Sequence, residues 1–198
     1  MKPKKPRDPV PGERHSLKQV EKDGKIFDNL VELFMKENKE NIEKISRDYL
    51  KNIPPEVTDE INQFVALFLD DEPLSEEEIK IADDEFVEVQ VQGVAQALVS
   101  LWINILWDTQ RNQNKAKLKL QKNLLPTNDA LENPPSVKEY LELCVCADFN
   151  LTKEQAIGLL KSFANKVEEE VEKTSMVQLP LNLCLKKDSE GFFVTKQQ

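Results

Sequence analysis

The sequence predicts a mainly α-helical protein, an irregular bundle of about five helices that ends in a C-terminal β-hairpin or an extended arm. Three observations lead to this prediction. Apolar residues recur at intervals of three and four through most of the chain, which is the spacing of one face of a helix. Three Ser or Thr residues are each followed three positions later by Glu or Gln, the capping-box pattern of a helix start. Residues 177 to 185 alternate apolar and polar side chains, which is strand spacing.

Residues 1 to 24 are rich in Pro and Gly and contain few apolar side chains, so we expect a flexible tail there. The tail contains a small basic cluster. As a functional feature this cluster would be a nuclear-import or polyanion-docking patch, but short basic runs are common and a solvated tail is the preferred interpretation. The cluster consists of Lys2, Lys4, Lys5 and Arg7.

Two helical segments follow the tail and together span residues 25 to 70. Apolar side chains recur at helical spacing in residues 25 to 51, and a polar stretch at 36 to 41 leaves open one long helix or two short ones. Pro54 and Pro55 end this segment, because proline cannot donate its amide and disfavours helix in the residue before it. The next stripe predicts a core helix of about four turns. Its members are Val57, Ile61, Phe64, Val65 and Phe68.

A long central helix should begin at the capping box formed by Ser75 and Glu78. Its apolar pattern could run to about Asn123, with a kink near Gly93 or an end near Thr109 as alternatives. Residues 70 to 88 hold ten acidic side chains against one basic one, whereas residues 111 to 122 hold five basic side chains and no acidic one. This polarity matches the helix macrodipole, and the basic end could also dock on an acidic partner.

The C-terminal third contains two further capping boxes and the alternating segment. Ser136 with Glu139 predicts a short helix, and Thr152 with Gln155 predicts a longer one that closes near Thr174. Turn-forming residues at 188 to 191 then separate the alternating run from a second apolar group, which predicts a hairpin or an extended arm over residues 175 to 198. The predicted organisation is therefore a tail (1–24), a helical domain (25–174) and a hairpin or arm (175–198).

Composition narrows the class of protein. The chain has 198 residues, 39% hydrophobic and 32% charged, with a net charge of −9, which is typical of a folded acidic protein and argues against general nucleic-acid binding. Three cysteines without framework spacing and an N-terminus without an apolar leader favour a cytoplasmic location, with the nucleus as the alternative through the basic cluster. The uncharged run from Val89 to Trp107 is long enough for a membrane span, but its Gln, Ser and Asn residues favour a buried core helix.

No pattern in the sequence points to catalysis. The single histidine, His15, falls in the predicted tail, and the five glycines are scattered, so no nucleophile-base arrangement or phosphate-binding loop can be assembled. The cysteines Cys144, Cys146 and Cys184 lack zinc-site spacing and are interpreted as small apolar residues. Carboxylates are abundant, but no pair is distinguished from the rest. We therefore expect no catalytic residue, cofactor or metal, and a protein that is not an enzyme.

The leading functional hypothesis is a protein-protein interaction or scaffold protein whose partner is another protein. Two docking surfaces are predicted: the basic helix end, through charge complementarity, and the C-terminal edge, through strand addition. Their candidate residues are Arg111, Lys115, Lys117, Lys119 and Lys122 for the first surface, and Leu181, Leu183, Phe192 and Phe193 for the second.

The alternative hypothesis is a helical bundle that binds a hydrophobic small molecule or lipid. Its cavity would lie beside Phe86, Leu98, Trp102 and Phe163. The oligomeric state and the partner's identity do not follow from the sequence.

Overall fold

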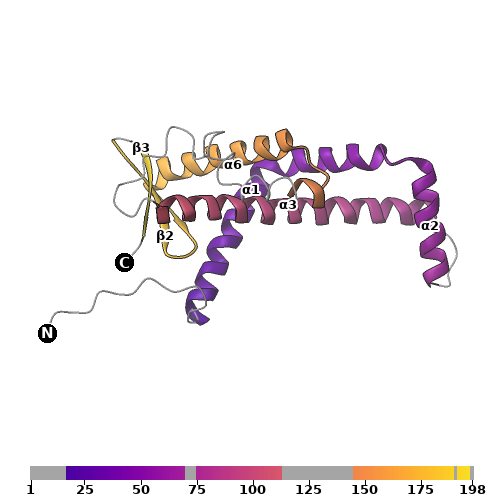
Figure 1. The fold of residues 1–198 in the computed structure, drawn as a ribbon, viewed down its shortest axis with the longest axis horizontal. Helices are drawn as coiled ribbons and strands as arrows, with labels where there is room; N and C mark the ends of the chain where they lie inside the picture. The colour runs from indigo at the N-terminus through magenta and orange to yellow at the C-terminus, as the bar shows by residue number, and fades with distance from the viewer. Residues whose placement is uncertain (1–16, 70–74, 113–144, 190, 197–198) are drawn as a thin grey trace.

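The computed structural model describes residues 17–69, 75–112, 145–189 and 191–196. This part of the chain is mostly helical and carries a small antiparallel sheet at its C-terminus, in the strand order β1-β2-β3 (Figure 1). It holds four long helices where the sequence predicted about five. The elements are α1 (Leu17–Lys51), α2 (Pro55–Leu69), α3 (Glu76–Asn112), α6 (Lys153–Thr174), β1 (Met176–Leu179), β2 (Leu183–Asp188) and β3 (Gly191–Lys196).

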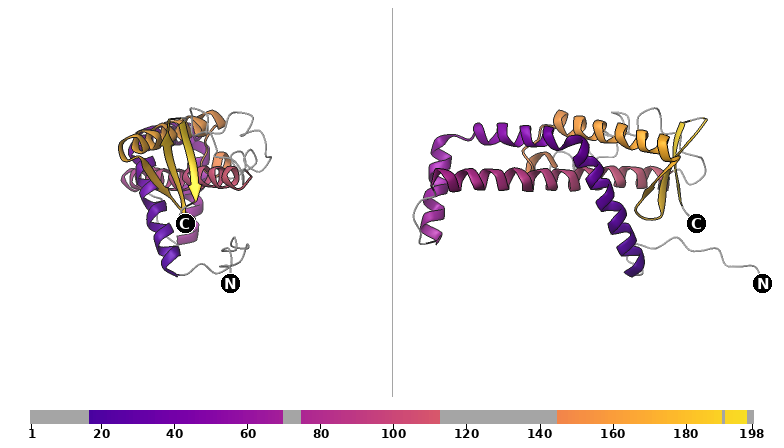
Figure 2. Two further views of the ribbon diagram at one scale, coloured as in Figure 1. Left: turned by 90° about the vertical axis from the view of Figure 1, so that its left-hand side faces the viewer. Right: turned by 180° about the vertical axis from the view of Figure 1, so that it is seen from behind.

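Helices α1, α3 and α6 form the body of the molecule. The long part of α1 runs antiparallel to α3, and α6 lies along the same pair, parallel to α3 (Figure 1). The sheet lies at one end of this body and α2 stands across the opposite end. Figure 2 shows that α1 bends along its length, so its N-terminal part leaves the line of the other helices.

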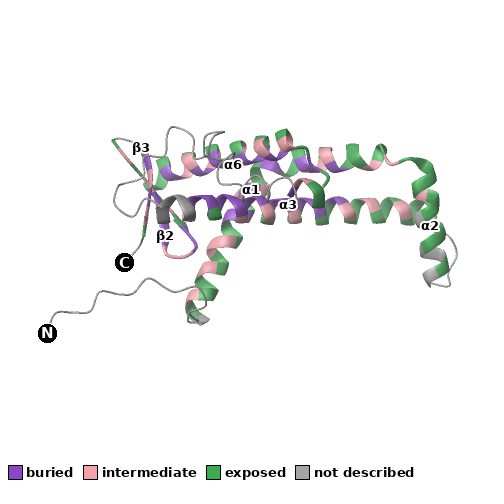
Figure 3. Ribbon diagram, viewed as in Figure 1, coloured by how far each residue is buried: buried purple, intermediate pink, exposed green. Residues whose placement is uncertain are grey.

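An aromatic cluster joins the three body helices at their centre. The ring of Phe163 on α6 packs against Phe34 on α1, with a centroid distance of 5.3 Å, and edge-on against Trp102 on α3, at 5.2 Å. All three side chains are fully buried. Such tilted and edge-on pairs are the favourable geometry for aromatic rings. Figure 3 shows the buried residues gathered where α3 and α6 face their neighbours.

Helix α1 differs from its prediction at its start and selects the first of the two predicted alternatives, one long helix. It begins at Leu17 rather than at Lys25, so part of the predicted tail is helical, and it passes through the polar stretch at 36–41 without a break. Asn38, within that stretch, is buried and its Nδ2 donates a hydrogen bond to the Leu159 carbonyl of α6 at 3.3 Å. The polar stretch therefore contributes a buried contact between helices, which an apolar-periodicity pattern cannot reveal.

Two of the three predicted capping boxes lie in the described part of the chain, and both are confirmed, at the starts of α3 and α6. The Ser75 amide and hydroxyl donate to the Glu78 carboxylate at 2.8 and 2.7 Å at the start of α3. At the start of α6, Thr152 and Gln155 form the reciprocal capping box. The third predicted box, at Ser136, lies outside the described residues.

Gly93 lies in the middle of α3, which continues through it without interruption. A Cβ atom built on this glycine would overlap the ring of Phe149, whose segment precedes α6. Close packing against an aromatic ring therefore explains a glycine that is unfavourable by helix propensity. Gly158 in α6 and Gly24 in α1 are different, since a Cβ atom there meets nothing within 4 Å.

The alternating C-terminal run folds into a hairpin instead of a single strand. The chain reverses between Leu179 and Leu183, which pair with each other, and the turn residues Leu181 and Asn182 take φ values of 63° and 57°. A second reversal, between Asp188 and Gly191, lies where the turn residues predicted it. The result is a three-stranded sheet rather than a two-stranded hairpin. One face of the sheet is buried, through Leu179, Leu183, Leu185, Phe192 and Val194.

The two kinds of glycine give a matched test of packing. We expect Gly93→Ala to destabilise the protein by on the order of 1–3 kcal/mol, because the added methyl group must displace the Phe149 ring. Gly158→Ala should instead stabilise it by about 0.5–1 kcal/mol, since it gains only helix propensity. Urea unfolding followed by circular dichroism measures both, and equal stabilities for the two variants would contradict this account of Gly93.

Candidate interaction surfaces

The junction between α1 and α2 is set by Pro54 and Pro55. Helix α1 closes with short-range backbone bonds, such as the Asn52 amide to the Tyr49 carbonyl at 3.0 Å. The Pro54 carbonyl then accepts from the Val57 amide at 3.0 Å and begins α2, with Pro55 at its first helical position. Proline suits that position because its missing amide proton has no partner there in any case. Two consecutive prolines therefore end one helix, start the next and turn the chain.

Beyond the start of α6, α1 and α3 continue as a pair toward α2. The rings of Tyr49 and Phe86 stack at 6.5 Å between centroids, and Arg47 Nη2 lies 2.9 Å from Asp84 Oδ1. The Arg47 and Asp84 side chains are about half exposed, so this ion pair contributes at most about 1 kcal/mol. The stacked rings and the pairing of α1 with α3 thus hold together the two-helix part of the molecule that leads to α2.

Helix α2 exposes apolar side chains, so the prediction that Val57 and Phe64 belong to the core was wrong, while the side chains of Ile61, Val65 and Phe68 lie outside the described part of the chain. The exposed fractions are 41% for Val57, 61% for Phe64 and 83% for Leu67. Among the described elements, α2 packs broadly against none of the others. Apolar periodicity predicted correctly that a helix forms at 55–69, but it cannot show that another element covers the apolar face.

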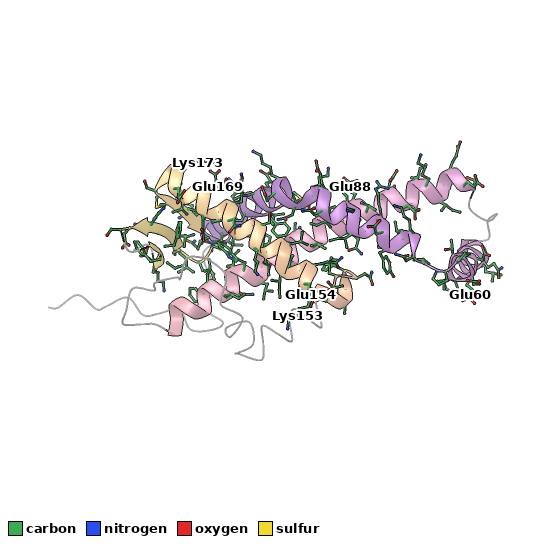
Figure 4. The ribbon with its side chains drawn as sticks, turned by 90° about the horizontal axis from the view of Figure 1, so that it is seen from above. Glu60, Glu88, Lys153, Glu154, Glu169 and Lys173 are labelled. Carbon is green, nitrogen blue, oxygen red and sulfur yellow. The ribbon has the colours of Figure 1, made fainter. Side chains whose placement is uncertain are left out.

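Three exposed apolar side chains of α2 lie along one stripe together with Glu60. Val57, Glu60, Phe64 and Leu67 follow one another at intervals of three, four and three residues, which places them on the same side of the helix. We call these four residues the α2 stripe. Figure 4 views α2 end-on and labels Glu60 at the end of the molecule away from the sheet.

The negative charge of the protein is concentrated in the same region, residues 43–89, which we call the acidic arm. It contains 15 acidic and 4 basic side chains, whereas the rest of the chain contains 21 acidic and 23 basic ones. The acidic arm therefore carries the whole net negative charge. The helix dipole accounts for the acidic run at 70–88 from the sequence alone, but the coincidence of this run with an exposed apolar helix is visible only in the structure.

A defined electrostatic interaction stabilises the start of α3 within the acidic arm. The hydroxyl and then the backbone amide of Ser75 donate to the Glu78 carboxylate, and these hydrogen bonds lower the pKa of Glu78 below its ordinary value. A carboxyl group whose pKa is lowered by folding stabilises the folded state above its unfolded pKa, and this stabilisation is lost as the pH falls through the lowered pKa.

We expect Ser75→Ala to raise the pKa of Glu78 toward the ordinary value of 4.5, because the substitution removes the hydroxyl donor. A titration of the Glu78 carboxyl carbon by NMR measures this shift. Thr152→Ala, which removes the corresponding cap of α6, serves as the control and should leave the Glu78 titration unchanged. An identical Glu78 pKa in the wild type and in Ser75→Ala would contradict the assigned cause.

The four candidate residues of the C-terminal edge differ in their burial: two are buried and two are partly exposed. Leu183 and Phe192 face the helices and are buried, with exposed fractions of 1% and 8%. Leu181, in the turn, and Phe193, on β3, are partly exposed. Strand β3 pairs with β2 on one side and forms an outer edge of the three-stranded sheet. Buried Leu183 and Phe192 therefore stabilise the sheet, and a strand-adding partner would meet β3.

Most of the predicted basic surface lies outside the described residues. Arg111 falls in the last turn of α3, while Lys115, Lys117, Lys119 and Lys122 fall in residues 113–144.

His15 and Cys144 also lie outside the described residues, whereas Cys184 is buried with its Sγ 3.0 Å from Thr195 Oγ1. Within the described ranges, no group of three His, Cys, Asp or Glu side chains could hold a metal ion.

The residues of the predicted cavity are only partly brought together. Trp102 and Phe163 pack directly against each other, and Leu98 is fully buried in the same core. Phe86 is separate and stacks on Tyr49 in the acidic arm. A single site beside all four side chains is therefore not formed.

One segment within α3, Glu76–Trp107, is long and apolar enough to cross a membrane by length and composition, and 61% of its apolar window is buried inside the structure. The same property is found in the core helix of a soluble bundle, so it is weak evidence for a span.

Comparison with known proteins assigns no family: no protein-family model, curated protein or solved structure matches the chain.

Proposed function

We propose that this chain is a non-enzymatic protein-protein interaction or assembly protein, and that α2 is its principal docking element. The observation that supports this most is the exposure of Val57, Phe64 and Leu67 on one side of a single helix. Scattered apolar side chains are normal on a protein surface, but an apolar group gathered on one element is typical of an interaction site.

The contacts that hold α2 in place support the same proposal. Its first turn is fixed by Pro54 and Pro55, and the α1–α3 pair beneath it is joined through Tyr49 and Phe86. A helix that is already formed before docking loses less conformational entropy on binding than a segment that must fold on its partner.

The two surfaces predicted from the sequence remain part of the proposal. The basic segment 111–122 would dock on an acidic partner. Strand β3 would accept a partner strand at its outer edge, which leaves Phe193 as the candidate that is partly exposed there. The cytoplasmic location, the nuclear alternative and the small-molecule-binding alternative stay predictions.

Site-specific photo-cross-linking in the native cell tests the proposed function. A photoreactive phenylalanine analogue is placed at Leu67 on α2, at Phe193 on β3, or at the control position Glu154, which is exposed on α6 (Figure 4). We expect a discrete covalent adduct with a protein from position 67. An adduct from position 193 alone would move the docking site to the sheet edge, and no adduct from either position would refute docking through α2 and through the sheet edge.

A further inference from the structure

We infer that the α2 stripe binds a basic amphipathic helix of a partner protein. This inference rests on the proposed interaction function and specifies the partner's chemistry. It follows from three properties of the described residues: the spacing of the stripe, the length of α2 and the charge of the acidic arm.

The spacing of the stripe matches a helix as the partner. Intervals of three, four and three residues produce a narrow seam that runs along α2, as in the contact surface of two helices that cross at a shallow angle. An extended strand would need a free sheet edge, and α2 offers none because its backbone is helical over all of its 15 residues. At about 1.5 Å per residue, the stripe from Val57 to Leu67 presents a seam of about 15 Å, enough for about three turns of a second helix.

The charge of the acidic arm selects a basic partner. Glu60 lies within the stripe, and Glu56 and Asp59 are exposed beside it. The excess of 15 acidic over 4 basic side chains would repel a second copy of the acidic arm, a nucleic acid or an anionic membrane surface. Lysine and arginine side chains that flank an apolar seam would instead accelerate association and favour the correct partner.

A synthetic peptide can represent the partner. The probe is an 18-residue helical peptide with leucine at the seam positions and lysine or arginine elsewhere, titrated onto the full 198-residue chain and followed by fluorescence anisotropy. We expect it to bind at least about tenfold more tightly than a peptide of the same composition in scrambled order, because only the ordered peptide presents a seam. Binding should weaken as salt is raised, because salt screens exposed charges.

Two pairs of variants separate specific docking from general attraction to an acidic surface. Leu67→Ser should weaken binding about tenfold, whereas Val89→Ser, which alters an apolar residue 70% exposed on α3 in the same acidic arm, should change it less than about twofold. Glu60→Gln should weaken binding several-fold, and Glu154→Gln, on α6, should not. Because Leu67 is 83% exposed, its variant should keep the wild-type circular dichroism spectrum and melting temperature.

Three outcomes would overturn the inference: equal binding of the ordered and scrambled peptides, equal effects of Leu67→Ser and Val89→Ser, or a dimer of the unliganded chain that Leu67→Ser dissociates in sedimentation. The third outcome would make a second copy the occupant. Failure of the inference can be distinguished from failure of the proposed function. A cross-link from position 67 to a partner segment that is not basic and helical overturns only the inference, whereas absence of a cross-link from position 67 overturns the proposed function of α2 as the principal docking element.

Discussion

The contact of Phe163 with Phe34 and Trp102 ties the three body helices together, and the rest of the described structure is arranged around it. Each ring comes from a different helix, and each is fully buried. Removing any one of them would leave a large cavity at the point where α1, α3 and α6 meet. The sheet follows directly from α6 and packs its apolar face against the end of the same core, so its position also depends on how α6 is seated.

Helix lengths determine which part of the molecule lacks such a core. Helix α3 has 37 residues and spans about 55 Å, while α6 has 22 residues and spans about 33 Å. Helix α6 therefore covers the sheet end of α3 and leaves the other end to a two-helix pair. Two helices bury much less apolar surface than three, and the chain that turns off their end at Pro54 has no third layer to pack against. The exposure of α2 is thus a consequence of the bundle's geometry.

The helices of the body were predictable because their signals are local. Capping boxes at Ser75 and Thr152 fix two helix starts through hydrogen bonds between residues three positions apart, and apolar periodicity identifies the buried faces of α3 and α6. The features that were not predictable depend on distant residues. Asn38 is buried because α6 supplies the Leu159 carbonyl, and Gly93 is required because Phe149 lies over it. The reversal at Leu181 and Asn182 was missed because it lacks the glycine that usually marks such a turn.

The α2 stripe could not be predicted from the sequence for a similar reason, since its exposure depends on distant parts of the chain. Val57 and Phe64 of the α2 stripe were assigned to the core, and Leu67 was not singled out, because a pattern of side chains does not reveal what covers them. The charge distribution was the available signal. An exposed apolar helix promotes aggregation unless neighbouring charges keep copies of the chain apart. Residues 43–89 carry a large excess of one charge, with 15 acidic and 4 basic side chains. Under the proposed function, the charges that oppose self-association would also restrict what can approach α2, so both effects would arise from the same residues.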